Sequence, residues 1–318
     1  MNLSVTTMDK LNPARLALTV GPLPYYWPRQ SLLDFYADVA DSAADTVVLG
    51  ETVCARRREL NLDDWLALAR DLAAAGKEVL LATQTLVESE SDLRLLRRLV
   101  AQHEFVVEAG DASALRLLAG TPFALSPHIN IYNRPALVEH AALGAVRWTA
   151  PAELPLDALA FVNPPHDPVT CPQGRPLATE VFAFGRLPLA FSARCFTARH
   201  HHLKKDECGY RCIDDADGLL LSSGEGQPFL VLNGTQTQSA AHHCLLGDGA
   251  ALRAAGVSRL RLQPMSRGLP RIVAAFDSVM NHGGDAVAAL DEITAMQLVG
   301  GLGNGFAHRR PGLEWVRS

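Results

Sequence analysis

A regular alternation of short apolar runs and amphipathic stretches constrains the fold of this chain most strongly. Each run is followed by about ten residues whose apolar side chains recur at helical spacing. The six runs lie at residues 16–20, 46–49, 78–82, 105–107, 123–125 and 145–148. This order predicts a parallel sheet with helices on its outer face. It favours a (β/α)8 TIM-barrel-like fold over an open doubly wound sheet. The first run also lacks the GxGxxG turn of a dinucleotide fold.

Residues 151–178 interrupt this rhythm. They contain seven prolines, and proline neither continues a helix nor donates to a strand ladder. We interpret the segment as a loop insertion within one domain, not as a linker between independent domains. A seventh strand at residues 180–185 resumes the pattern and leads into a cysteine-rich insertion at residues 193–246.

The eighth strand is expected at residues 257–262, and two helices at residues 271–280 and 285–298 complete the fold. The sequence therefore predicts one barrel-like domain over residues 14–298, with the cysteine-rich insertion between strands seven and eight. The glycine-rich residues 299–318 are expected to form a flexible C-terminal tail.

Composition narrows the class of partner and the compartment. A net charge of −5 argues against nucleic acid as the main partner. No window offers the eighteen or more apolar residues of a membrane span. The first ten residues lack the apolar segment of a signal peptide. We therefore expect a cytoplasmic protein without a membrane span, in which cysteines serve metal or redox chemistry rather than structural disulfides.

Four of the six cysteines are expected at one end of the barrel. Cys54 lies five residues after the strand that ends at Leu49, and Cys195, Cys208 and Cys212 follow strand seven. Loops that follow parallel barrel strands share one face, so these thiols are expected to converge. Four thiolates suit tetrahedral zinc or an iron–sulfur cluster. One remote and three clustered cysteines favour the cluster, but structural zinc and unliganded thiols remain open alternatives.

Four segments of the sequence resemble the collagenase-like peptidase family. They are residues 184–190 (FGRLPLA), 193–200 (ARCFTARH), 205–208 (KDEC) and 233–239 (NGTQTQS). The likeness extends from Leu16 to about Leu298. It implies a [4Fe–4S] cluster whose ligands are Cys54, Cys195, Cys208 and Cys212.

The resemblance also implies partners and a role. It points to a heterodimer with a sister protein that carries its own cluster. Such pairs are associated with oxygen-independent hydroxylation of a polyprenylated aromatic substrate in ubiquinone biosynthesis, alongside a small lipid-carrier protein. The chain would then be a subunit of an O2-independent hydroxylase whose catalytic residues are unknown. A collagenase-like peptidase and a non-catalytic iron–sulfur or zinc subunit are the alternatives.

The sequence offers no catalytic device for a peptidase. No Ser/His/Asp arrangement can be placed, and HExxH is absent. The fragment Glu180-x-Phe182-x-x-Gly185 resembles the family's peptidase signature, but it is not an active site. Cys171 and Cys244 have no counterpart in the resemblance, and we expect both to be non-ligands.

Several polar residues near the cysteines have two interpretations. The three histidines at residues 200–202 could approach the cluster or face solvent. Arg194, Arg199 and Arg211 could offset the charge of an anionic cluster, and so could the run at residues 56–58, although such a run is usually an exposed helix start. Glu51 and Glu108 could each be a general acid or base, or could pair with an arginine.

Overall fold

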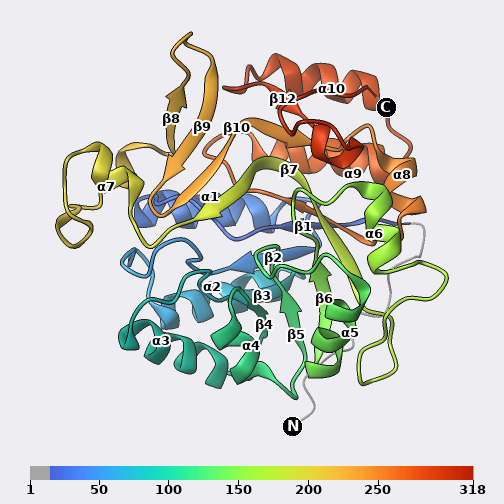
Figure 1. Ribbon diagram of the computed structural model, residues 1–318, viewed down its shortest axis with the longest axis horizontal. Helices are drawn as coiled ribbons and strands as arrows, with labels where there is room; N and C mark the ends of the chain where they lie inside the picture. Colours follow the sequence, from blue (N-terminus) through green and yellow to red (C-terminus); the bar gives the residue numbers. More distant parts are fainter. Residues whose placement is uncertain (1–14, 318) are drawn as a thin grey trace.

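The computed structural model describes residues 15–317, and eight parallel strands in this part of the chain close into a barrel (Figure 1). Neighbouring strands pair in sequence order, and the last pairs with both the first and the seventh. The predicted (β/α)8 TIM-barrel-like fold is confirmed. The barrel strands are β1 (Ala17–Val20), β2 (Thr46–Leu49), β3 (Glu78–Ala82), β4 (Val106–Ala109), β5 (Phe123–Leu125), β6 (Ala145–Thr149), β7 (Ala178–Phe191) and β11 (Arg259–Leu262).

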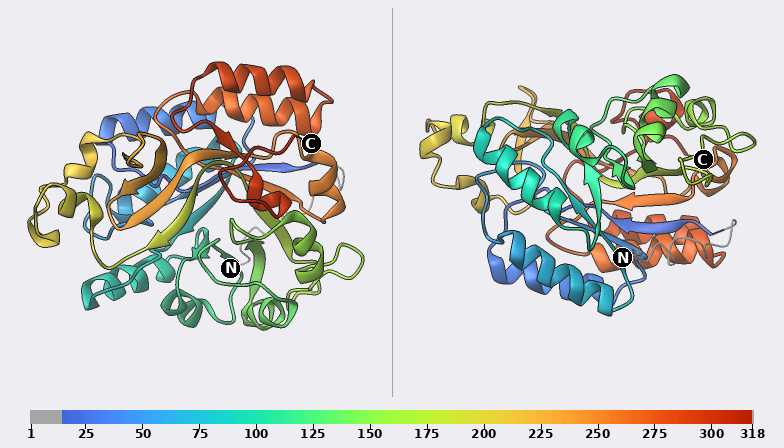
Figure 2. Two further views of the ribbon diagram at one scale, coloured as in Figure 1. Left: turned by 45° about the horizontal axis from the view of Figure 1, so that its top comes forward. Right: turned by 90° about the horizontal axis from the view of Figure 1, so that it is seen from below.

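Helices surround the barrel, and several begin at a side chain that accepts backbone N–H groups. Asn61 and Ser89 form capping boxes with Asp64 and Asp92. Figure 2 shows the last two long helices lying side by side. The helices are α1 (Arg29–Ala40), α2 (Leu62–Ala74), α3 (Glu90–Ala101), α4 (Ala112–Leu118), α5 (Arg134–Leu143), α6 (Leu156–Val162), α8 (Gly249–Ala254), α9 (Leu269–Asn281) and α10 (Ala286–Ala295).

The cysteine-rich insertion lies between β7 and β11, as expected. Strand β7 runs beyond the barrel and pairs there with β10 (Gln236–Cys244), which forms a hairpin with β9 (Pro228–Asn233). Strand β8 (Leu219–Ser222) is the outer edge of this small antiparallel sheet. The insertion also holds α7 (Phe196–His200) and the short 3-10 helices η2 (Lys205–Glu207) and η3 (Arg211–Asp214), at the left of Figure 1.

The proline-rich segment is not only a loop, so that prediction was too coarse. Helix α6 begins after Pro155 and buries Leu156, Leu159 and Val162, and it is the barrel helix between β6 and β7. Proline is tolerated at the start of a helix because the first N–H groups have no partner there. The irregular part is therefore confined to the residues between α6 and β7.

The expected C-terminal tail is packed against the insertion. Strand β12 (Leu302–Gly303) pairs in parallel with His242 and His243 of β10, and η4 (Gly305–His308) follows it. Asn304 exchanges hydrogen bonds of 2.7 and 2.8 Å with the backbone of Val316. These contacts use backbone groups and glycines, which leave no apolar periodicity in the sequence. Residue 14, where the domain was expected to begin, and the first ten residues lie outside the described part.

Charged residues form part of the barrel interior. Arg147 donates to both carboxylate oxygens of Glu78, at 2.7 and 2.9 Å. Arg261 is buried between Glu108 and Glu180. No helix among residues 15–317 has the length and hydropathy needed to cross a bilayer.

Candidate metal centre

The four predicted ligands lie on two segments at the same end of the barrel. Cys54 is in the loop after β2, Cys195 directly precedes α7, and Cys208 and Cys212 lie in the η2–η3 region. All four thiols are free and partly exposed. Both segments follow the carboxyl ends of parallel strands, whose loops share one face of a barrel.

Three of the four thiols lie close enough that ionisation of one affects the pKa of another. Cys195 lies within interaction range of both Cys54 and Cys212. Burial raises the pKa of Cys54 and of Cys212, while nearby Arg57 acts in the opposite direction on both. Cys208 precedes Cys212 by four residues, but among the described residues it takes no part in these interactions. The structure thus brings together Cys54, Cys195 and Cys212, and places Cys208 on the same loop.

The turn between β9 and β10 connects the two cysteine-bearing segments. The Thr235 hydroxyl donates to the carbonyl of Val53, next to Cys54, at 2.7 Å. The Gly234 carbonyl accepts from the N–H of Phe196, next to Cys195, at 2.8 Å. The Gly234 N–H donates to Thr197 Oγ1 at 3.0 Å. One turn therefore fixes the neighbours of both thiols.

Arg57 is the buried cation of this centre. Its guanidinium donates to Pro24 O at 2.6 Å and to Asn233 Oδ1 at 2.7 Å, and its positive charge lowers the pKa of the nearby Cys212 thiol against the effect of burial. Burial alone would lower the pKa of Arg57, but Glu51 and the two thiols raise it. Sequence reasoning considered the whole run at residues 56–58 for this role, but nothing in the sequence distinguishes Arg57 from Arg56 and Arg58.

The segment with Cys208 and Cys212 is anchored on the loops after β1 and β2. Gly209 and Tyr210 both adopt left-handed backbone conformations, so the chain turns sharply between the two cysteines. The Tyr210 ring packs against Tyr26 with centroids 5.8 Å apart. Arg56 donates to Asp206 Oδ1 at 2.6 Å and to its carbonyl at 2.7 Å. These contacts hold the segment beside Cys54.

Four thiols are donors of the kind that bind zinc or an iron–sulfur cluster. Within residues 15–317, no three Cys, His, Asp or Glu side chains are grouped closely enough to hold one metal ion. A tetrahedral zinc site requires such a group, because all its ligands contact the same atom. In a [4Fe–4S] cluster each thiolate binds a different iron, so the sulfurs stand farther apart. Four thiols and a fixed cation match that chemistry.

The other basic residues near the cysteines are less engaged. Arg194 and Arg199 are exposed, and Arg211 pairs with Asp214 at 3.0 Å on the surface. His200 and His202 are exposed, while His201 packs edge-on against His200 at 5.1 Å. The His201 Nε2 atom is buried without a partner. Among the arginines considered at this end of the barrel, Arg57 is therefore the one that is buried.

Both carboxylates considered as general acids or bases pair with an arginine. Glu51 lies 3.7 Å from Arg57 and accepts the N–H groups of Val53 and Cys54. Burial raises the pKa of Glu51. Glu108 accepts from Arg261 at 3.0 Å inside the barrel.

The two remaining cysteines are buried. Cys244 ends β10 within the hydrophobic core, and burial raises its pKa to about 12. Cys171 is 4% exposed and forms a backbone hydrogen bond with Arg175.

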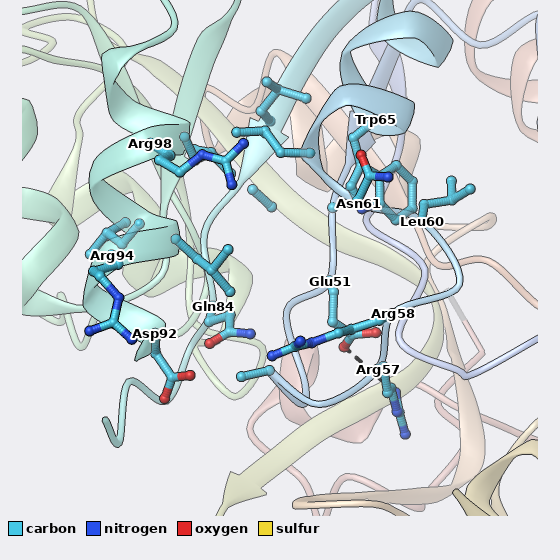
Figure 3. A pocket seen from close by; sticks show the side chains of 18 of the residues that line it. Glu51, Arg57, Arg58, Leu60, Asn61, Trp65, Gln84, Asp92, Arg94 and Arg98 are labelled. Carbon is cyan, nitrogen blue, oxygen red and sulfur yellow. Dashed lines mark ion pairs between the residues drawn. The ribbon is translucent and has the colours of Figure 1, made fainter. Parts of the chain in front are cut away.

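Two cavities flank the loop that carries Cys54. One, of about 590 Å3, is lined by Cys54, Arg56, Lys205 and Tyr210 among others. The other, of about 550 Å3, opens between α2 and α3 (Figure 3). Ala55, Arg58, Ser91 and Asp92 line both cavities. Cys54 thus lines a cavity that adjoins a second cavity with a more apolar lining.

Similar proteins of known structure are distant. A tryptophan synthase from M. tuberculosis is 12% identical, with 87% of this chain and 93% of that chain covered and a TM-score of 0.40. A dihydropteroate synthase from Burkholderia cenocepacia is 14% identical, with 89% and 94% covered and a TM-score of 0.40. The assignment of the barrel rests on the strand pairing described above.

Sequence comparison is more specific. A protein named collagenase from Porphyromonas gingivalis is 28% identical over 202 residues, which are 57% of this chain and 48% of that protein. The chain thus spans about half the length of this relative. The model of peptidase family U32 matches residues 33–293. Because this match covers most of the barrel and the cysteine-rich insertion, the chain belongs to peptidase family U32.

Proposed function

We propose that this chain is an iron–sulfur protein that holds a [4Fe–4S] cluster through Cys54, Cys195, Cys208 and Cys212. The observation that carries the proposal is the convergence of Cys54 with Cys195 and Cys212, from loops far apart in the sequence, beside buried Arg57. Thiolate ligation of iron and a compensating buried cation explain this arrangement together.

Anaerobic purification followed by iron, sulfide and zinc analysis tests the cluster. We expect a brown protein with about four iron and four sulfide per chain. Cys195→Ala should lose the colour and most of the iron, whereas Cys171→Ala, at a buried cysteine outside the centre, should retain both. A colourless native protein with stoichiometric zinc would exclude the cluster.

For the biological role, we infer that the chain resembles UbiV and works with a UbiU-like partner. The pair would act in oxygen-independent hydroxylation during ubiquinone biosynthesis, with a polyprenylated aromatic substrate and a small lipid-carrier protein. The motifs at residues 193–200 and 233–239 support this role, since they form α7 and the turn that fixes the centre. When bound, the cluster would supply electron transfer or bind an oxygen donor.

Anaerobic co-purification and complementation test the role. A tagged native chain should retain a UbiU-like partner and restore anaerobic quinone formation in cells that lack the UbiV-like protein. Cys195→Ala should fail in complementation. Restoration by a folded, clusterless variant would instead identify a non-catalytic subunit whose partner performs the chemistry.

A collagenase-like peptidase is the second candidate, and the family match and the collagenase relative favour it. Gelatin hydrolysis distinguishes the two functions. Proteolysis by native protein that survives replacement of all four cysteines would support the peptidase. Its absence from freshly purified protein would count against it.

A further inference from the structure

The cavity between α2 and α3 has an apolar body. Its floor includes Leu81 of β3, and its walls include Leu62 and Trp65 of α2 and Leu95 and Leu99 of α3. Its volume is about 550 Å3, which is within the range of pockets that enclose small organic ligands. Such pockets are mostly apolar and contain a few polar groups. Leu95 keeps 38% of its surface exposed at this site.

Three arginines at this cavity have no acidic partner. Arg58 comes from the loop after β2, and Arg94 and Arg98 come from α3. Figure 3 shows Arg58 and Arg98 extending toward the cavity from opposite sides. Within residues 15–317, none of the three guanidinium groups takes part in an ion pair or side-chain hydrogen bond.

Two arginines on the same helices that do not line the cavity are, in contrast, paired with acidic residues. Arg97 of α3 pairs with Glu90 at 2.7 Å, and Arg70 of α2 pairs with Glu104 at 2.7 Å. The contrast is therefore between these two paired arginines, which are not part of the lining, and three unpaired ones that line the cavity.

Among residues 15–317, the carboxylates of the lining form no ion pair with these three arginines. Glu51 is engaged by Arg57 and by backbone N–H groups. Asp92 accepts the N–H groups of Glu88 and Ser89 as part of the α3 cap. Asp63 is the remaining acidic residue of the lining. The lining holds four arginines and three carboxylates, so the cavity has an excess of one positive charge in a chain whose net charge is −5.

We propose that this cavity binds an amphipathic organic anion, with its apolar body between α2 and α3 and its acidic group at Arg58, Arg94 and Arg98. Guanidinium groups bind carboxylates and similar oxyanions through charge-assisted hydrogen bonds. Because Arg58 also lines the cavity that contains Cys54, the bound anion lies beside the metal centre. The site itself does not depend on a bound cluster.

Binding of dodecanoate, kept below its micellar concentration, tests the site by calorimetry and by the change in tryptophan fluorescence, with Trp65→Phe to identify the contribution of Trp65 among the four tryptophans. Dodecanol is the uncharged control. The flat aromatic acid 2-naphthoate distinguishes a ring from a chain as the apolar body. We expect at least one of the two acids to bind and dodecanol to bind at least tenfold more weakly, because a hydrogen bond to a charged group contributes about 1.5–3 kcal/mol.

Two double variants locate the site. Arg94→Glu with Arg98→Glu should weaken binding of the acid about tenfold or more. Arg70→Glu with Arg97→Glu changes the net charge equally outside the cavity and should leave affinity within about twofold. Circular dichroism and thermal melting confirm that both variants fold. Equal losses in the two variants, or no binding of either acid, would overturn the proposal.

A third arm separates this inference from the cluster proposal. Cys195→Ala should bind the acid as the native chain does, whether or not iron is present. Loss of binding in folded Cys195→Ala would contradict a site formed by α2, α3 and the loop after β2. Normal binding together with an absence of iron in the native protein would leave this inference standing and remove the cluster.

Discussion

At the scale of the residue, Arg57 links the structural and chemical parts of the centre. It is buried, with 2% of its side chain exposed, and lies 3.7 Å from Glu51. The pattern of cysteines could be read from the sequence because each follows a predicted strand. The buried arginine could not, since burial of one member of a basic run depends on Pro24 and Asn233, which approach only after folding.

Replacement of Arg57 tests its part in the fold without reference to iron. Arg57→Met should lower the free energy of unfolding of metal-free protein by about 3 kcal/mol, because removal of one partner of a buried pair leaves the other uncompensated. Arg58→Met, at an exposed neighbour, should change it by less than about 0.5 kcal/mol. Urea denaturation of both variants measures the difference, and equal effects would show that Arg57 has no special structural role.

At the scale of the element, the β9–β10 hairpin positions the centre. Its existence was predictable from an apolar run that ends in Asn233-Gly234. Its function was not, because the hydrogen bonds to Val53 and to Phe196 join segments far apart in the sequence. For the same reason α6 was hidden within a proline-rich stretch, where composition indicated a loop and the tertiary fold required a barrel helix.

Gly234 provides a test of this hairpin. Its φ is +63°, and an added Cβ would lie 3.1 Å from Arg57 Nη2. Backbone strain alone should cost about 1 kcal/mol in Gly234→Ala. Because the added Cβ also crowds Arg57, the total loss of stability should be larger, and the iron content should fall. Gly174→Ala is the matched control, since Gly174 has a φ of +74° but no atom within 4 Å of an added Cβ. Similar stability and iron content in both variants would contradict the positioning role.

At the scale of the whole molecule, β10 joins the barrel, the insertion and the C-terminal segment. It pairs with β7, β9 and β12. The closed barrel followed from local strand–helix alternation, which is written in the sequence. Packing of the C-terminal segment could not be predicted from the sequence. It depends on backbone pairing with His242 and His243 and on the close approach of Gly300 to Ala240.

The two histidines of this junction predict the response to acid. Burial lowers the pKa of His242 to about 3, with a further contribution from Arg186, and lowers that of His243 to about 4, with a contribution from His308. Both are therefore neutral in the folded protein, while an unfolded histidine titrates near pH 6.5. Their contribution to stability is complete above about pH 6.5 and is lost as the pH falls toward 4, because the unfolded chain then binds protons that the folded chain does not.

When the pH is lowered from 7 to 5, each of the two histidines should reduce the free energy of unfolding by about 2 kcal/mol. Urea denaturation at the two pH values measures this loss in the native chain. His243→Gln should reduce the difference between the two pH values, even if it lowers stability at both, whereas His103→Gln, at an exposed position, should leave the difference unchanged. An undiminished difference in His243→Gln would mean that His243 is charged in the folded protein, and the junction of barrel, insertion and C-terminal segment would then have to accommodate that charge.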